Sequence, residues 1–186
     1  MNARGISLTL LHALDRPLLE SDAIARDVTM DVRSILVPVD YSECSAKAVT
    51  LAAELASKFG APLDLVHVWD RPAYVSDATK VGHGDTARSL VDLICENARE
   101  EMERFTAKLQ LAPGVTLTKR LLAGNPAAVV LQELGEGRHD LLVIGTHGRT
   151  GLSHLLLGSV AEKLVRLSPV PVLTVPQRST SQEHTL

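Results

Sequence analysis

The chain has 186 residues, of which 45% are hydrophobic and 22% are charged. This length suits one domain with a short appendage and excludes a large multidomain enzyme, and the composition is too apolar for a disordered chain. The formal net charge of −3 gives no general attraction for nucleic acid or for an anionic membrane. Aromatic residues, at 3%, offer no platform for stacking single-stranded RNA.

No apolar run approaches the roughly 18 residues that span a bilayer, so we expect a soluble protein with neither a membrane nor nucleic acid as its partner. Cys44 and Cys95 are not in a metal-binding or CxxC spacing, which predicts two free thiols in a reducing, cytoplasmic compartment. Residues 6–14 resemble the apolar part of a signal peptide. Charged residues separate them from the Ala-Ile-Ala site at residues 23–25, which argues against export.

The texture of the sequence changes at Met30. From Ser34 onward, short Val, Leu and Ile runs alternate with longer segments of helical period, which is typical of repeated βα units and a mostly parallel sheet. We therefore divide the chain into an N-terminal extension (1–30), one α/β domain (31–176) and a C-terminal tail (177–186). The extension is a helix that docks on the domain or a partner, a flexible arm, or sequence upstream of a true start at Met30.

The first half of the domain predicts two strands and two helices. A strand over Ile35–Val39 precedes a helix that Asp40 and Ser42 cap and that Gly60 closes. The second strand, Leu63–Trp69, contains His67, which we interpret as an interior histidine with a satisfied hydrogen bond. After a polar loop, the longest helix is expected over residues 86–110, because apolar residues recur there at helical spacing. Its apolar stripe consists of Val91, Ile94, Ala98, Met102, Phe105 and Leu109.

The second half predicts three strands and two helices. The strand over residues 115–122 alternates apolar residues with Thr and Arg, so one of its faces should be wet and the strand should lie at an edge. Asn125-Pro126 starts a helix that reaches Leu134, and a last helix runs from Gly158-Ser159 to about Leu167. The run Leu141–Ile144 is continuously apolar and therefore central. The final strand, Val170–Val175, contains Pro171, which favours an edge.

Five strands with the third and fifth at the edges fit several orders, including 3-2-1-4-5. In that order, the connections of the first and fourth strands leave in opposite directions, and a doubly wound sheet binds ligands at the carboxyl ends of such strands. These ends are Val39-Asp40 and Ile144-Gly145.

The segment from Gly145 to Ser159 carries the strongest chemical signal in the chain. It places four glycines and the hydroxyls of Thr150 and Ser159 between a central strand and a helix start. Glycine lets backbone amides approach an anion closely, and a helix amino terminus offers unpaired N–H groups. The segment therefore indicates a phosphate site, although it matches neither the P-loop nor the GxGxxG pattern. The alternative is a turn-rich connection whose glycines serve only the backbone.

The pattern Gly145-x2-Gly148-x9-Gly158-Ser159 resembles the G-2x-G-9x-G-[ST] nucleotide motif of the ATP-binding subgroup of the universal stress protein family. The segments ILVPVD (35–40), LVHVW (65–69) and GSVAEKLVRLSPVPVLTV (158–175) resemble the same family, and the resemblance covers about residues 31–176. It implies an α/β fold with an open five-stranded parallel sheet of order 3-2-1-4-5 and helices on both faces, the adenine nucleotide alpha hydrolase-like arrangement.

The resemblance also implies a ligand, which would be ATP, ADP or AMP. Mg²⁺ or Mn²⁺ would be bound through the phosphates, because the sequence shows no carboxylate cluster that could cage a metal ion. The adenosine would lie against Pro38, Val39, Asp40, the backbone of Val68, Ile144 and Gly145. The phosphates would be held by Gly148, Arg149, Gly158, Ser159 and Val160.

Several of these residues also have simpler interpretations. Asp40 could only cap a helix, Arg149 could be a solvated loop charge, and Ser159 could be only the N-cap of the last helix. His147 and His154 lie seven residues apart across a glycine-rich loop without a third ligand nearby, so we predict no metal site made by the protein itself.

No nucleophile elbow, carboxylate pair or water-orienting residue is visible, so no catalytic residue is assigned. We expect an ATP-binding stress-response regulator with slow or no hydrolysis. A true ATPase or nucleotidyl-transfer enzyme and a nucleotide-free dimeric scaffold remain as alternatives. The intact glycine spacing argues against the scaffold, because a lost site should tolerate side chains at those positions. The resemblance also implies a homodimer, formed through Val170–Val175.

Overall fold

The computed structural model describes residues 31–69, 76, 79–83, 87–148 and 157–176. The predictions for residues 1–30, for the tail after Pro176, and for Arg149 and His154 lie outside these residues. The main sheet has five parallel strands in the order β5-β2-β1-β6-β7. Counted along this sheet alone, that is the order 3-2-1-4-5, so the predicted fold class is confirmed.

The five strands are β1 (Ile35–Pro38), β2 (Leu63–Trp69), β5 (Leu117–Ala123), β6 (Leu141–Gly145) and β7 (Val172–Val175). Covered on both faces, β1 and β6 are almost entirely buried, which is why their sequences are continuously apolar. Ile35 pairs with Leu141, so the residues that follow β1 lie beside the end of β6. The third and fifth strands lie at the edges as predicted, and each begins two residues later than expected.

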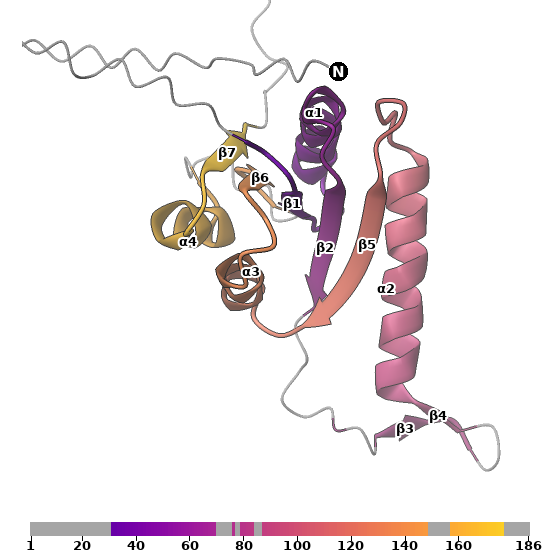
Figure 1. Ribbon diagram of the computed structural model, residues 1–186. Helices are drawn as coiled ribbons and strands as arrows, with labels where there is room; N and C mark the ends of the chain where they lie inside the picture. Colours follow the sequence, from indigo (N-terminus) through magenta and orange to yellow (C-terminus); the bar gives the residue numbers. More distant parts are fainter. Residues whose placement is uncertain (1–30, 70–75, 77–78, 84–86, 149–156, 177–186) are drawn as a thin grey trace, which may run out of the picture.

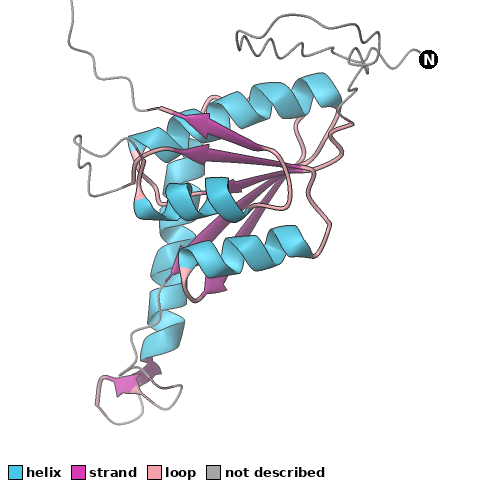
Figure 2. Ribbon diagram, turned by 90° about the vertical axis from the view of Figure 1, so that its left-hand side faces the viewer, coloured by secondary structure: helices cyan, strands magenta, loops and turns pink. Residues whose placement is uncertain are grey.

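Helices cover both faces of the sheet (Figures 1 and 2). On one face, α1 (Glu43–Phe59) and α2 (Leu90–Ala107) pack on a core that includes Val37, Val49 and Leu65. On the other face, α3 (Pro126–Gly135) and α4 (Ser159–Leu167) enclose a second core around Leu36, Val66 and Leu142. None of the helices within the described ranges is both long and apolar enough to cross a lipid bilayer.

The sequence signals for the ends of α1 and α3 are confirmed. Ser42 is the N-cap of α1 and accepts a hydrogen bond from the amide of Ser45, while Gly60 ends the helix in the left-handed conformation. Asn125 caps α3 in the same way, with Pro126 at the first helical position. Both helices therefore begin at the carboxyl edge of the sheet, where the predicted site lies.

The predicted start of α2 was wrong. The helix begins four residues later than expected, at Leu90, because Ser89 accepts a hydrogen bond from the Asp92 amide and so caps it. The preceding residues form β4 (Arg88–Ser89), which pairs antiparallel with β3 (Lys80–Val81). Two-residue strands have no periodicity that a sequence pattern could reveal.

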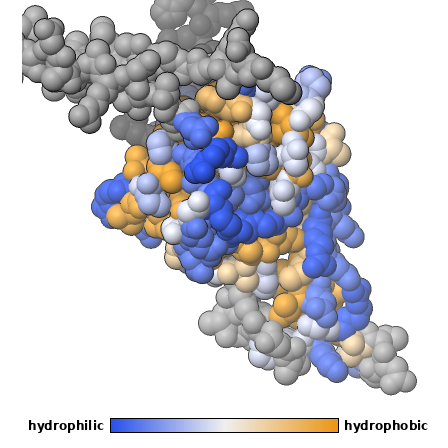
Figure 3. Space-filling view, in the orientation of Figure 1, coloured by the Kyte–Doolittle hydropathy of each residue, from blue (hydrophilic) through white to orange (hydrophobic). Residues whose placement is uncertain are grey.

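The amino-terminal half of α2 projects beyond the sheet together with the β3–β4 pair (Figure 2). In the half that packs on the sheet, Ala98, Met102 and Phe105 are buried as predicted. Val91 and Ile94 in the projecting half are only half-buried. The outer side of α2 is hydrophilic (Figure 3), in keeping with its exposed Glu and Arg residues.

A charged cluster lies under α3, and it includes Arg120, the arginine of the β5 face that was expected to be solvent-exposed. Arg120 of β5 donates to Asp64 of β2 at 2.9 Å and to Glu133 of α3 at 2.6 Å. Arg138 donates to the same Glu133 carboxylate at 2.7 Å. The imidazole Nε2 of His139 lies 3.6 Å from Asp64. Because the side chains of Asp64, Arg120 and Glu133 are mostly buried, their charges must be satisfied within the cluster.

His139 should make folding stability depend on pH. Burial is the main cause that lowers the pKa of His139 below its ordinary value of 6.5; the Asp64 charge opposes this, and the Arg120 and Arg138 charges add to it. Just below the ordinary value, the folded protein keeps His139 neutral while the unfolded chain binds a proton, so acid favours unfolding.

We expect the free energy of unfolding to fall between about pH 7 and about pH 5, and this one proton contributes at most about 1.4 kcal/mol per pH unit. The measurement is urea unfolding of the wild type and of His139→Gln across this range. The variant should show a flatter profile. Parallel profiles would mean that His139 titrates alike in the folded and unfolded chains.

Candidate functional site

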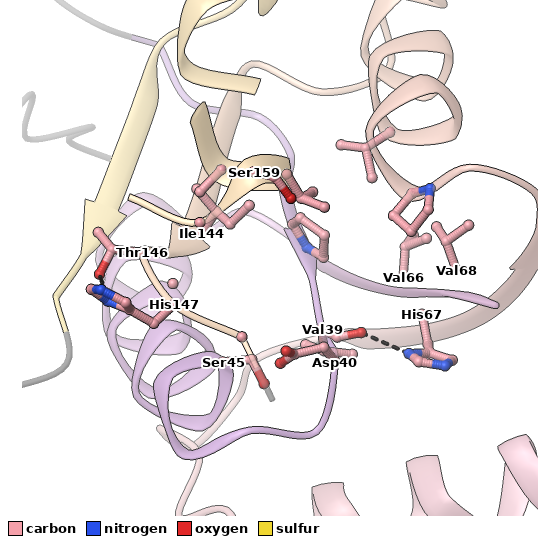
Figure 4. A pocket seen from close by; sticks show the side chains of 18 residues that line it. Val39, Asp40, Ser45, Val66, His67, Val68, Ile144, Thr146, His147 and Ser159 are labelled. Carbon is pink, nitrogen blue, oxygen red and sulfur yellow. Dashed lines mark hydrogen bonds between the residues drawn. The ribbon is translucent and has the colours of Figure 1, made fainter. Parts of the chain in front are cut away.

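A cavity of about 260 Å³ opens at the carboxyl ends of β1, β2 and β6, on the face that α3 and α4 cover (Figure 4). All of the predicted site residues that lie within the described ranges line it: Pro38, Val39, Asp40, Val68, Ile144, Gly145, Gly148, Gly158, Ser159 and Val160. Arg149 lies outside those ranges. The structure thus brings the ends of two distant segments, 38–40 and 144–160, into one pocket.

The pocket also contains residues that the sequence analysis did not assign to it: Ser45, Val66, His67, Pro126, Val130, Thr146, His147 and Ala161. Val66 could have been found, because strand alternation places it on the same face as Val68. Pro126 could also have been found, since the α3 start lies at the ligand-binding edge of the sheet. Ser45 lies in the first turn of α1 and Val130 in the middle of α3, and no local motif marks either residue as part of a pocket.

One wall of the pocket is apolar. Val66 and Val68 of β2 line it together with Pro126 and Val130 of α3. Ile144 lies across from Val66 and Val68 (Figure 4). Val66 and Val130 are fully buried, so this wall is built from the core that fixes α3 to the sheet. It offers a planar apolar group a contact surface without an aromatic stacking partner.

Asp40 lies at the opposite end of the pocket, and it does not cap α1 directly. One carboxylate oxygen, Oδ1, accepts hydrogen bonds from the Ser42 amide at 3.1 Å and from the Ser42 hydroxyl at 2.6 Å. The other, Oδ2, lies 2.7 Å from the point that a Cβ on Gly148 would occupy. Asp40 therefore supports the N-cap residue on one side and packs against the glycine loop on the other.

The two other described glycines of the motif are also enclosed by protein atoms. A Cβ on Gly145 would lie 2.8 Å from the Cys44 Sγ and 3.0 Å from the Cys44 carbonyl carbon. A Cβ on Gly158 would lie 3.2 Å from the carbonyl oxygen of Thr146, which accepts the Gly158 amide at 2.7 Å. The motif is therefore also a packing device, which holds α1, β6 and the start of α4 together.

Gly145→Ala should destabilise the protein in the absence of any ligand. Its Cβ would overlap a buried thiol and the α1 backbone, and such overpacking costs about 1–3 kcal/mol. Chemical denaturation of the nucleotide-free protein measures this loss. Gly135→Ala, where a Cβ meets nothing within 4 Å, is the control and should not reduce stability. Equal stability of the two variants would show that the β6–α1 contact relaxes without cost.

The start of α4 differs from the other helix starts described. Side chains of Ser42, Ser89 and Asn125 cap α1, α2 and α3. The N-cap of α4 is Gly158, so the interpretation of Ser159 as N-cap was wrong: Ser159 is exposed at the first helical position, and no side-chain bond caps this helix. Residues 158–161 line the pocket, and in the described part of the chain no side chain caps this helix start, so an anion bound there would satisfy its first-turn amides.

Two further polar groups near the pocket, the His67 imidazole and the Cys44 thiol, form hydrogen bonds with backbone carbonyls. The Nδ1–H of His67 donates to the carbonyl of Val39 at 2.7 Å (Figure 4), which confirms His67 as a hydrogen-bonded histidine. Both cysteines are free thiols, and the Cys44 Sγ donates to the Val175 carbonyl at 3.2 Å. In the described part of the chain, no three His, Cys, Asp or Glu side chains lie close enough together to hold a metal ion.

Comparison with known proteins places this fold and pocket in a family context. The model of the universal stress protein family matches residues 31–176. The chain is similar to universal stress protein YxiE of Bacillus subtilis, at 34% identity over 76% of this chain and 97% of that protein. It is also similar to a universal stress protein of Methanocaldococcus jannaschii, at 32% identity over 77% of this chain and 81% of that protein.

A solved structure shares both the fold and part of the sequence. It is a universal stress protein crystallised in complex with cAMP, 27% identical to this chain, with a TM-score of 0.52. The match covers 78% of this chain and 97% of that one.

Proposed function

Because the chain belongs to the universal stress protein family, we propose that it is an ATP-binding stress-response regulator whose pocket at the carboxyl ends of β1, β2 and β6 holds the nucleotide. The observation that carries the proposal is the uncapped start of α4, which lines this pocket beside Gly145 and Gly148. A helix start without its own acceptor is suited to phosphate. A related structure holds cAMP, an adenine nucleotide.

The pocket suggests how the nucleotide lies. The apolar wall of Val66, Val68 and Val130 suits the adenine ring, and the Val68 backbone would bond the edge of that ring. Asp40 would lie near the ribose, and Pro38 and Val39 would lie beneath the adenosine. Ile144 and Gly145 would underlie the ribose and first phosphate, and the phosphate tail would extend over Gly148, Arg149, Gly158, Ser159 and Val160.

Mg²⁺ or Mn²⁺ fits this pocket only as a companion of the phosphates. The described residues offer Asp40 and hydroxyl groups there but no set of carboxylates to coordinate the ion. When bound, the metal would neutralise phosphate charge. The residues of this chain would bind the base, orient the ribose and satisfy the phosphate oxygens.

We further propose that residues 31–176 form the nucleotide-binding domain, with residues 1–30 as an extension and 177–186 as a tail, in a cytoplasmic homodimer. The β7 edge, together with exposed Val165 and Leu167 on α4, offers a surface for a second copy. ATP occupancy would change the shape or assembly of the protein, and hydrolysis would be slow or absent.

The test is to denature the freshly purified protein, identify any released nucleotide by mass spectrometry, and then titrate the emptied protein with Mg-ATP. Val68→Trp fills the adenine wall without changing the backbone and should abolish binding, whereas Val81→Trp on exposed β3 is its matched control. Wild type that carries no nucleotide and takes up no ATP would refute the proposal. Steady phosphate release that Val68→Trp abolishes would instead identify an ATPase.

A further inference from the structure

We propose that Tyr41 and His67 are positioning residues for the nucleotide pocket, and that Tyr41 couples nucleotide binding to helix α2. This inference rests on the proposed function, because it concerns the pocket assigned there to ATP. It is carried by contacts on the opposite face of the sheet from the pocket, where α1 and α2 pack.

His67 fixes the end of β1 from the neighbouring strand. Strand alternation directs Val66 and Val68 into the pocket and sends the His67 side chain to the other face (Figure 4). There its Nδ1–H donates to the Val39 carbonyl at 2.7 Å, while the Val39 amide donates to the Val66 carbonyl at 2.9 Å. Both the amide and the carbonyl of Val39, the residue immediately before Asp40, are thus fixed by hydrogen bonds to β2.

Tyr41 fixes the other side of Asp40. Its φ of +65° lies in the left-handed region, and among the described residues it is the only non-glycine residue with a positive φ. Such a conformation persists where surrounding contacts impose it, and it is often found at functional sites. The Tyr41 ring stacks on the His67 ring, with centroids 4.2 Å apart and an interplanar angle of 25°. Asp40 therefore stands between two residues whose positions depend on the same stacked pair.

The same tyrosine reaches α2. Its hydroxyl donates to the carbonyl of Ala98 at 3.2 Å, and its ring centroid lies 5.5 Å from that of Phe105, two turns further along the helix. Ala98 and Phe105 both lie on the buried face of α2. One side chain thus joins the pocket loop to the helix whose amino-terminal half projects beyond the sheet (Figure 2).

A ligand that fixes Asp40 through its ribose also fixes Tyr41, and through Tyr41 it restrains α2. Coupling between two sites is reciprocal, so a contact that restrains α2 must also strengthen nucleotide binding. The projecting half of α2, with β3 and β4 attached, is then the part of the molecule that reports whether the pocket is occupied.

Tyr41→Phe tests the coupling because it keeps the stacked ring and removes the hydroxyl that donates to Ala98. We expect Mg-ATP to bind more weakly by up to about fivefold, because one neutral hydrogen bond is worth about 1 kcal/mol and the loss of affinity cannot exceed the value of the bond. Hydrogen exchange should show that ATP protects the Ala98–Phe105 segment in wild type and protects it much less in Tyr41→Phe. Thr106→Val is the matched control: it removes a hydroxyl-to-carbonyl bond of 2.9 Å within α2, to Met102, and should leave ATP affinity unchanged.

The His67 bond is tested by rescue. His67→Ala should weaken ATP binding, and His67→Asn, whose side-chain amide can donate from nearly the same place as Nδ1, should restore part of it. The inference is overturned if Tyr41→Phe binds ATP as tightly as wild type does and if ATP does not change the hydrogen exchange of α2. The proposal that the protein binds ATP would still stand. If wild type binds no ATP, the proposed function fails and this inference fails with it.

Discussion

Replacing Ser159 by Asp should weaken ATP binding on the order of 100-fold, because two unit charges about 5 Å apart repel by about 3 kcal/mol at an effective dielectric constant of about 20. Ser159 is exposed at the first position of α4, where we place the phosphates. The same substitution should not harm the fold. An acidic residue in the first helical turn stabilises a helix by about 0.3–1 kcal/mol. Calorimetric titration with Mg-ATP and thermal unfolding of the empty protein measure the two effects.

Adenosine is the control ligand for Ser159→Asp, because it lacks phosphates and should bind wild type and variant alike. A Ser159→Asp variant that is at least as stable as wild type but binds ATP more weakly would have lost binding and not folding. A glycine variant cannot make this distinction, because it lowers stability as well. Unchanged ATP affinity in Ser159→Asp would mean that the phosphates do not lie at the start of α4.

The spacing of the glycines correctly predicted where the pocket lies, but it is weaker evidence for what the pocket binds. Their spacing led to the pocket, and every described member of the motif lines it. The inference that a lost nucleotide site would tolerate side chains at these positions is weakened by the structure, because Gly145 packs on Cys44 and Gly148 on Asp40. Folding alone can preserve the spacing, so the uncapped α4 start is the better evidence for a phosphate site.

The strands and most helix ends could be predicted because their signals are local, whereas the apolar runs alone fitted several strand orders and only the family resemblance implied the one observed. Apolar runs mark the central strands, and Ser42, Gly60 and Asn125 mark the helix ends where the structure has them. Two features depend on distant contacts and could not be predicted. The left-handed backbone conformation of Tyr41 is stabilised by its contacts with β2 and α2. The side chain of Arg120 points inward because it forms ion pairs with Asp64 and Glu133.

The charged cluster under α3 provides the largest expected loss of stability. Arg120→Met leaves Asp64 without its strongest partner and removes one of the two guanidinium groups on Glu133. Breaking a buried ion pair in this way costs about 3–5 kcal/mol. Arg104→Met, which removes an exposed pair with Glu100 at 3.5 Å, should cost less than about 1 kcal/mol. Urea unfolding near neutral pH compares the two variants.

The pH dependence of the Arg120→Met defect tests its cause. Burial alone would raise the pKa of Glu133, but the hydrogen bond from Arg120 and the charges of Arg120 and Arg138 hold it below its ordinary value. The stability that this carboxylate contributes is present above the ordinary value of 4.5 and is lost as the pH falls below it. The gap between wild type and Arg120→Met should therefore narrow in acid. The double variant Asp64→Asn, Arg120→Met tests the coupling between these two residues. If its loss in the free energy of unfolding equalled the sum of the losses of the two single variants, the residues would act independently and the cluster would not be a coupled unit.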